Sequence, residues 1–302
     1  LRATDREGPA RGAPEGKRGR MGDVMQERTG AARPAQREAA ADRRTDGASP
    51  VLRADGITLT FGGVTALSEV SLTVGRDELV ALIGPNGAGK SSLLNVLSGF
   101  YRPRAGSIAF EGTDISRWPV HRIARAGIAR TFQGTHLLSH MSVIDNIMVG
   151  RFFHMRANLA QAFLYFPWSH REEVENRAIA EEIIDFLEIE HIRHQPVGTL
   201  GYGMRKRVDL GRALAMEPKI LLMDEPMAGM NNEEKEDLAR FILDIREARR
   251  TPVVLVEHDM GVVMDIADRV AVLNFGRMIA DGTPAEVRRN PEVVSAYLGG
   301  HA

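Results

Sequence analysis

The chain has 302 residues, a formal net charge of −1 and 43% hydrophobic residues. This length and apolar content support one large domain or two small ones with a sizeable core, and the balanced charge gives no electrostatic reason to expect a nucleic-acid partner. The sequence contains no cysteine, which excludes disulfides and cysteine metal sites and fits a reducing compartment.

Residues 1–48 differ from the rest of the chain. They are rich in Arg, Ala, Gly and Glu, contain no aromatic residue and show no sustained apolar periodicity. Such a segment cannot bury enough apolar surface to offset its chain entropy, so we expect it to be disordered and to lack the apolar centre of a signal peptide. Two interpretations stay open: the arginines contact anionic lipid or RNA, or the segment is a solvated tail with Met21 as the true start.

From Val51 onward, strand patterns alternate with helix patterns. Residues 57–61 and 70–74 alternate with a period of two, as half-exposed antiparallel strands do, and 107–110 adds another strand. The runs 79–83, 220–223 and 253–256 are continuously apolar, which is typical of buried parallel strands. Apolar residues at helical spacing over 171–187 predict an amphipathic helix. We therefore expect an α/β domain over 49–302, with antiparallel strands at its front and a helical region in its middle.

The stretch 84–91 reads Gly-Pro-Asn-Gly-Ala-Gly-Lys-Ser and fits the phosphate-binding pattern G-x-x-x-x-G-K-[ST]. It lies between the strand pattern at 79–83 and a helix pattern at 92–97, and a helix N-terminus favours anions. We expect Lys90 to reach the β- and γ-phosphates of a nucleoside triphosphate and Ser91 to ligate Mg²⁺. The residues predicted to contact the nucleotide here are Gly84, Pro85, Asn86, Gly87, Ala88, Gly89, Lys90, Ser91 and Ser92.

Polar side chains follow the next two apolar strands. Asp224 and Glu225 end the run at 220–223, and His258 follows the run at 253–256. Ligands gather at the carboxyl ends of parallel strands, so these groups are expected near the phosphates. Phosphoryl transfer needs a held Mg²⁺ and a positioned water; Asp224 is the candidate metal ligand, Glu225 the candidate base, and His258 the candidate transition-state contact.

Two further features support a nucleotide site because of their positions along the chain. Gln133 follows a predicted helix and is a candidate contact for both Mg²⁺ and the attacking water, which makes it a candidate catalytic residue and metal ligand. Gly201 and Gly203 precede a helical run that contains Val208, so Gly201, Tyr202 and Gly203 form a second potential anion-binding helix start; the alternative is a plain loop-to-helix turn.

Taken in order, these motifs resemble an ATP-binding cassette (ABC) ATPase from about residue 51 to the end. The matching segments are Walker A at 84–91, the Q-loop at Gln133, the signature position at 200–204, Walker B with its catalytic glutamate at 220–225, the D-loop at 227–231 and the switch histidine at His258. The resemblance implies a P-loop NTPase core with a parallel sheet, an antiparallel β subdomain, a helical signature subdomain over about 134–215 and a C-terminal extension over about 284–302. It also implies that Phe61 stacks on adenine; the alternative is a core phenylalanine at a strand end.

Several departures from the usual pattern help to classify the chain. Gly201, Tyr202 and Met204 replace the Ser, first Gly and Gln of L-S-G-G-Q, and Asn231 replaces the D-loop Asp. A signature with Tyr, together with the stretches 98–103 and 290–299, resembles branched-chain amino acid import ATPases. That resemblance implies a peripheral subunit at the cytoplasmic face of the inner membrane, bound to two permease subunits, paired with an identical or paralogous ATPase and served by a periplasmic binding protein.

We therefore predict an ATP-hydrolysing subunit of an importer for branched-chain amino acids or related small polar solutes, with ATP and Mg²⁺ as ligands and no nucleic-acid partner. No apolar run is long enough to cross a bilayer; the best candidate, 137–153, is interrupted by polar residues. The aromatic-rich segment 151–168 either packs within the helical subdomain or docks on the permease.

Other functions compete with this one. A soluble ABC ATPase of translation or DNA repair is the alternative, and typically carries two cassettes or a long coiled-coil insertion. A P-loop kinase or GTPase would need an acceptor pocket or a guanine-reading motif, and a non-hydrolysing regulatory cassette would not need Lys90, Asp224 and Glu225 together. We expect the cassette to form a dimer around ATP. Each nucleotide would lie between the P-loop of one subunit and the signature helix of the other. Closure of the dimer would pull on the permease through about 136–148.

Overall fold

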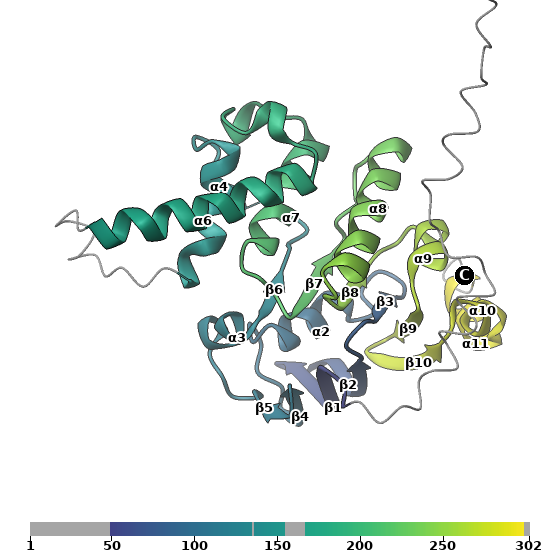
Figure 1. Cartoon of the computed structure of the whole chain (residues 1–302). Helices are drawn as coiled ribbons and strands as arrows, with labels where there is room; N and C mark the ends of the chain where they lie inside the picture. The colour runs from purple at the N-terminus through teal and green to yellow at the C-terminus, as the bar shows by residue number, and fades with distance from the viewer. Residues whose placement is uncertain (1–48, 135, 155–166, 299–302) are drawn as a thin grey trace, which may run out of the picture. The chain divides into compact units, whose positions relative to one another are not determined.

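The computed structural model divides the chain into two compact units, residues 1–45 and 46–302. It describes residues 49–134, 136–154 and 167–298, all of which lie in the second unit (Figure 1). The predicted disordered tail at 1–48 therefore lies outside the described residues, as does most of the aromatic-rich segment, including Phe163, Tyr165 and Phe166.

A six-stranded sheet forms the centre of the described unit, in the order β10-β9-β3-β8-β7-β6. Its first five strands in chain order are parallel and β10 pairs with β9 in the antiparallel sense. The strands are β3 (Leu79–Ile83), β6 (Ile128–Arg130), β7 (Ile220–Asp224), β8 (Val253–Val256), β9 (Arg269–Asn274) and β10 (Arg277–Gly282). The three apolar runs of the sequence are thus the adjacent central strands β3, β8 and β7, as predicted.

Both faces of this sheet are buried. Along β3, Leu79, Ala81 and Ile83 belong to one core cluster, whereas Val80 and Leu82 belong to the other. Successive side chains of a strand point to opposite faces, so a strand covered on both sides has to be apolar throughout. The first cluster lies against the helical region, and the second lies against the antiparallel sheet and α2.

A second sheet has four antiparallel strands in the order β2-β1-β4-β5. They are β1 (Leu52–Phe61), β2 (Val64–Val74), β4 (Ala105–Phe110) and β5 (Thr113–Asp114). Buried and more exposed residues alternate along the second half of β2, which is the pattern of a strand with one face on the core. The predicted antiparallel strands are confirmed, and the sheet includes all three of them.

Helices surround the sheets, and α4, α6 and α7 pack against one another as a helical region (Figure 1). The helices are α2 (Lys90–Leu97), α3 (Val120–Ala126), α4 (Val143–Gly150), α6 (Pro167–Phe186), α7 (Tyr202–Leu214), α8 (Asn232–Ala248), α9 (Met260–Ile266), α10 (Pro284–Arg289) and α11 (Pro291–Leu298), with short 3₁₀ turns at Arg151–Phe153, Glu190–Ile192 and Val197–Thr199. The amphipathic helix predicted at 171–187 is α6, which begins four residues earlier than expected.

One local expectation was wrong. Gln133 does not follow a helix: it comes after β6, a strand of three residues that pairs with β7. Three residues are too short to show a period, so the sequence offered only the preceding helix α3 as a pattern. Within the described part of the chain, no helix has the length and apolar character that crossing a membrane requires.

Candidate active site

The loop at 84–89 connects β3 to α2 and passes close to two other strands. Gly84 has φ +149°, and a Cβ there would lie 2.1 Å from the carbonyl oxygen of Leu273 on β9. Gly89 has φ +105°, and its Cβ would lie 2.8 Å from the carbonyl oxygen of Ala66 on β2. Only glycine fits at either position without moving the backbone around it, so the loop is held in this shape by its neighbours.

Lys90 is the first residue of α2 and is 5% exposed. Its Nζ donates to the carbonyl oxygens of Gly84, at 2.7 Å, and Pro85, at 3.0 Å, so the ammonium lies over the loop. Burial lowers the pKa of Lys90, while the charges of Glu225 and Asp224 oppose that shift. A buried cation at a helix N-terminus favours an anionic ligand at this loop.

The other loop residues surround this cation. The Ala88 N–H donates to the Pro85 oxygen at 3.1 Å, and the Gly276 N–H donates to the Ala88 oxygen at 2.9 Å, which ties the loop to the β9–β10 hairpin. Asn86 and Gly87 are exposed, and no atom lies within 4 Å of a Cβ built at Gly87. The first turn of α2 presents Ser91, which is exposed, and Ser92, which is half-buried.

Asp224, the last residue of β7, has its two carboxylate oxygens turned to different partners. The Ser91 hydroxyl donates to Oδ1 at 3.4 Å, and Arg130 Nη2 donates to Oδ2 at 2.8 Å. Asp224 is 5% exposed, so this ion pair is shielded from water. The carboxylate is therefore held in one orientation, with Oδ1 toward the start of α2.

Glu225 links Gln133 to His258. Gln133 Nε2 donates to Glu225 Oε2 at 2.6 Å, and His258 Nε2 lies 2.7 Å from Glu225 Oε1. The Glu225 backbone has φ +48°, a left-handed conformation that costs energy for a residue other than glycine, and its N–H donates to the Val256 oxygen at 2.9 Å. The structure thus brings together the three residues predicted to be catalytic, at the carboxyl ends of β6, β7 and β8.

Glu257 is a site residue that the sequence analysis did not single out. It lies between β8 and His258 and is 4% exposed. Its Oε1 accepts from the Met227 N–H at 2.7 Å and its Oε2 from the His258 N–H at 3.1 Å, so one carboxyl group fixes both loops beside Glu225. Burial raises the pKa of Glu257, and these two N–H groups oppose that shift. In the sequence, the position of this glutamate directly after an apolar strand could have identified it as a site residue.

Arg130 was also missed. Its Nη1 donates to Asn95 Oδ1 at 2.6 Å and to Ser98 Oγ at 3.1 Å, while Nη2 holds Asp224. Arg130 therefore bridges α2 and β7 from the end of β6. Its position three residues before Gln133 was a signal, but nothing in the local sequence shows that Asn95 of α2 and Ser98, just after that helix, are its partners.

The signature segment begins α7, with Gly201 as the residue before the first turn. A Cβ at Gly203 would lie 2.3 Å from Glu234 Oε1 of α8, whereas no atom lies within 4 Å of one built at Gly201. Tyr202 is 41% exposed and lies beside Gly229 in the loop after β7. Among the described residues, no hydrogen bond joins the side chain of Tyr202 to the cluster around Glu225.

Phe61 ends β1 and is 44% exposed. Its ring makes an edge-on contact with Tyr101, with a centroid distance of 5.0 Å and an interplanar angle of 76°. The alternative that Phe61 is a core residue is therefore wrong. The prediction that it stacks on an adenine stays a prediction, for which an exposed aromatic face is the required feature.

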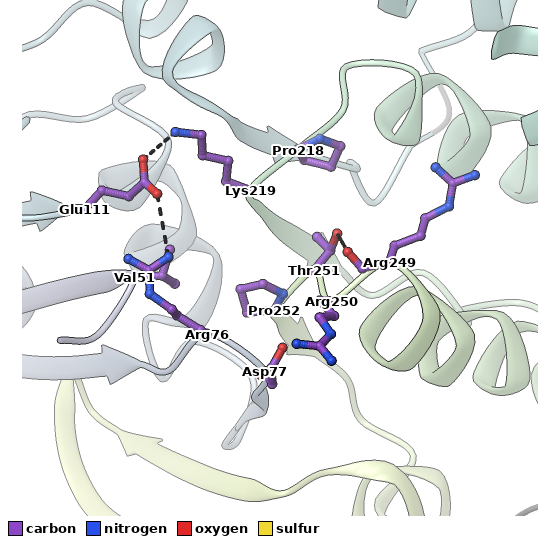
Figure 2. A pocket seen from close by; sticks show the side chains of 10 residues that line it. All are labelled: Val51, Arg76, Asp77, Glu111, Pro218, Lys219, Arg249, Arg250, Thr251 and Pro252. Atoms are coloured by element: carbon purple, nitrogen blue, oxygen red, sulfur yellow. Dashed lines mark hydrogen bonds and ion pairs between the residues drawn. The ribbon is translucent and has the colours of Figure 1, made fainter. Parts of the chain in front are cut away.

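A hollow of about 460 Å³ lies at the other edge of the central sheet (Figure 2). It is lined by Val51, Arg76, Asp77, Glu111, Pro218, Lys219, Arg249, Arg250, Thr251 and Pro252. Most of these residues precede β3, β7 and β8, so the hollow faces the amino ends of the strands. None of the predicted site residues lines it, and ligands of parallel α/β sheets bind at the carboxyl ends, so the candidate active site is the cluster around Glu225.

The chain is similar to known ATP-binding proteins. The family model described as "ABC transporter" matches residues 67–228, and the model described as "Branched-chain amino acid ATP-binding cassette transporter" matches residues 277–302. The chain is 39% identical over 250 residues to the high-affinity branched-chain amino acid transport ATP-binding protein BraF of Pseudomonas aeruginosa, which covers 83% of this chain and 98% of BraF. It is 39% identical over 253 residues to the LivG protein of Escherichia coli, with the same coverage.

Solved structures give the same result. The fold matches an ATP-binding cassette of an ABC transporter in its ADP conformation, with a TM-score of 0.73 and 34% identity, over 83% of this chain and 100% of that one. A nucleotide-free ATP-binding cassette from an ABC transporter matches with a TM-score of 0.72 and 33% identity, over 82% of this chain and 98% of the other.

Proposed function

Because the chain belongs to the ABC transporter family as an ATP-binding subunit, we propose that it uses ATP to drive the uptake of branched-chain amino acids or related small polar solutes through partner permeases. The observation that carries the proposal is the position of Glu225, held between Gln133 and His258 beside the loop at 84–89. The match of residues 277–302 to a branched-chain amino acid transporter model supports the choice of solute.

The loop at 84–89 and the start of α2 bind the phosphates. Lys90 supplies the cation, and its two carbonyl partners hold the ammonium over the loop, ready to exchange those contacts for phosphate oxygens. Gly87 leaves open space above the backbone, and Ser92 adds a polar side chain in the first turn of α2. The exposed ring of Phe61 takes the adenine.

The chemistry of Ser91 and Asp224 suits Mg²⁺. A hydroxyl and a carboxylate are hard oxygen ligands, and their oxygens lie 3.4 Å apart. Magnesium in such sites is held by a few protein oxygens together with phosphates and waters. Ser91, Asp224 and the side-chain oxygen of Gln133 can supply the protein oxygens. When bound, the ion neutralises charge on the phosphates.

Glu225 accepts a proton from the attacking water, and Gln133 and His258 fix its carboxylate. Each of the two Glu225 oxygens has one of these partners, at 2.6 and 2.7 Å, so the base is oriented before substrate arrives. His258 is 42% exposed at its side chain, which leaves it accessible to the terminal phosphate. Glu257 fixes the loop after β7 to the loop after β8 by accepting from the N–H groups of Met227 and His258.

The signature segment serves a second copy of the cassette. Gly201, Tyr202 and Gly203 lie at the N-terminus of α7, where Gly201 and Tyr202 are exposed and offer this helix start to the nucleotide of a paired ATPase, whereas Gly203 is buried beside Glu234. Two subunits, identical or paralogous, close on ATP and open after hydrolysis. Closure moves the segment 136–148 against two permease subunits, which a periplasmic binding protein supplies with solute.

This function places the chain at the cytoplasmic face of the inner membrane as a peripheral subunit. The alternative, a soluble ABC ATPase of translation or DNA repair, is not favoured, because the relatives that share most of the chain are transport ATP-binding proteins. A nucleic-acid partner is likewise not proposed, since the chain has a formal net charge of −1.

Uptake tests the proposal directly. A strain that lacks this chain should lose ATP-dependent uptake of labelled leucine, isoleucine and valine, and should regain it with the wild-type chain but not with Lys90→Ala. Lys90→Ala should bind ATP more weakly in a titration, because the phosphates lose their buried cation. Restored uptake by a variant that cannot bind ATP would contradict the proposal.

The same strain identifies the solute. If uptake of the three amino acids is normal without this chain, but uptake of an amide or a urea-like solute is lost, the transport role holds and the proposed cargo is wrong. Copurification of the chain with ribosomes or DNA, and not with membrane permeases, would favour the alternative function.

A further inference from the structure

The main chain around Gln133 is held by side chains of α7, the helix that carries the signature segment. Lys206 Nζ donates to the carbonyl oxygen of Gln133 at 2.7 Å and lies 3.4 Å from that of Phe132. Arg212 Nη1 donates to the carbonyl oxygen of His136 at 2.6 Å. Two cations of one helix therefore hold the segment that follows β6 on both sides of Gly134.

These cations belong to a charged set on one face of α7, whose members Lys206 and Asp209 are buried and Arg212 half-buried. Lys206, Asp209 and Arg212 are spaced by three residues, which places neighbouring side chains on the same side of a helix. Arg212 Nη2 donates to Asp209 Oδ1 at 2.6 Å, and Lys206 and Asp209 are 4% and 3% exposed. Burial raises the pKa of Asp209, and the charges of Arg212 and Lys206 oppose that shift.

A charged side chain is buried only where its partners repay the loss of water. Lys206 donates to main-chain carbonyls of a neighbouring segment. Its ammonium therefore fixes that segment and contributes little to the stability of α7 itself. In the absence of Lys206, the Gln133 carbonyl would lose a charge-assisted hydrogen bond, which is stronger than a neutral one. The contact thus determines where the Gln133 backbone lies relative to α7.

Gln133 is also the residue that reaches Glu225, through Nε2 and Oε2 at 2.6 Å. At the other end of the chain of contacts, Lys206 lies one helical turn after Tyr202 and 5.6 Å from the centre of its ring. The contacts therefore run without a break from the signature segment, through Lys206 and the Gln133 backbone, to the carboxylate of Glu225.

We propose that Lys206 is a positioning residue for hydrolysis: it ties Gln133 to α7, so that the place of the signature segment sets the contact between Gln133 and Glu225. The inference rests on the proposed function, in which the signature segment meets the nucleotide of a paired subunit. An ATP-bound partner thereby fixes Gln133 on the opposite chain, and the two sites of a dimer are linked by a residue that touches neither nucleotide.

The test compares Lys206→Met with two other variants in the assembled transporter. Lys206→Met removes the ammonium and keeps the length of the side chain; kcat for ATP hydrolysis should fall roughly ten- to hundredfold, as expected for a misplaced catalytic contact, while ATP affinity of the isolated chain stays unchanged. Lys206→Arg keeps a donor and should restore most of kcat. The matched control Lys219→Met, which removes an ammonium paired with Glu111 at the far edge of the sheet, should leave kcat unchanged.

A second measurement separates positioning from a general loss of stability. Hydrogen exchange of the amides at 131–134 should become faster in Lys206→Met and stay unchanged in Lys219→Met. In the Gln133→Ala background, Lys206→Met should reduce kcat no further, because the group it positions is gone.

Unchanged kcat in Lys206→Met, an additive loss in the double variant, or equal losses in Lys206→Met and Lys206→Arg would each overturn the inference. Failure of the proposed function gives a different result, since the wild-type chain would then not drive solute uptake in the assembled transporter. The exchange measurement reports on Lys206 whether or not the wild-type chain hydrolyses ATP.

Discussion

The two edges of the central sheet carry charged residues in opposite ways. At the carboxyl edge, Lys90 and Asp224 are each 5% exposed; Lys90 is bonded to the loop before its helix, and Asp224 to Arg130 at the end of β6. At the amino edge, the hollow of Figure 2 is lined by charges on the surface, such as Lys219, whose side chain is 54% exposed and pairs with Glu111. A concave shape alone therefore does not identify the functional edge, whereas buried charges that converge from several strands do.

The two edges also differ in how residues with a left-handed backbone are held in place. At the carboxyl edge, the left-handed conformation of Glu225 is kept by a hydrogen bond to β8 and by two side-chain partners. Arg250, at the amino edge, also has a left-handed backbone, with φ +49°, but it is exposed in the turn after α8. A strained residue that three contacts hold in place has a fixed side chain, which a catalytic base requires and a surface turn does not.

The largest effect is expected for Glu225→Gln at the carboxyl edge. The amide keeps the shape of the side chain but cannot take a proton, so ATP hydrolysis should fall by roughly 10²–10⁴-fold while ATP binding persists. Single-turnover hydrolysis together with a nucleotide titration measures both quantities. Normal turnover in this variant would remove Glu225 from the role of base and would weaken the distinction between the edges.

Arg130→Met should have the next largest effect. It leaves Asp224 buried without the cation that holds Oδ2, and breaking a buried ion pair from one side costs about 3–5 kcal/mol of unfolding free energy. Denaturant unfolding of the nucleotide-free chain measures this loss. Arg240→Met, which breaks the exposed pair with Glu188, is the control and should cost at most about 1 kcal/mol. Equal losses in the two variants would show that burial does not distinguish these ion pairs.

The parts of the site that the sequence predicted share one property: each is local in the chain. The loop at 84–91, Asp224 with Glu225, and His258 each follow an apolar strand directly, so strand pattern and polar residue can be found together. The parallel order of the strands then brings these positions to one edge. For the same reason, the alternation of β1 and β2 was enough to predict the antiparallel sheet.

The supporting residues could not be predicted in this way. Lys206 stands in the basic run Arg205-Lys206-Arg207, which in isolation is typical of a solvated helix face, yet Lys206 and Arg207 are 4% and 8% exposed. Their partners are the main chain near Gln133 and Asp237, far away in sequence. When a side chain is buried by elements that are distant in the sequence, the local pattern of apolar and polar residues does not show it. Only the tertiary structure shows which charged residues of a run are buried.

Buried lysines at the carboxyl edge should also shape the pH dependence of stability. Burial lowers the pKa of both Lys90 and Lys206 below the ordinary value of 10.5. Between each lowered pKa and 10.5, the unfolded chain binds more protons than the folded one, so the free energy of unfolding rises with pH in that window.

Lys206→Met removes one of these two groups. Its unfolding free energy should therefore rise less than that of the wild type from neutral pH toward 10.5. Denaturant unfolding of both nucleotide-free chains at a series of alkaline pH values measures the difference in slope. Parallel curves would mean that Lys206 binds its proton equally well in the folded and unfolded chains, contrary to its burial.

The smallest effect is expected at the amino edge, for Lys219→Met. The Lys219 and Glu111 side chains are 54% and 32% exposed, and an ion pair that water and salt can reach contributes about 0–1 kcal/mol. The loss should shrink further in about 1 M salt, where the Debye length is about 3 Å, and ATP hydrolysis should not change. A lower rate of hydrolysis in this variant would contradict the comparison between the two edges. The hollow at the amino edge would then take part in the activity, although it lies across the sheet from Glu225.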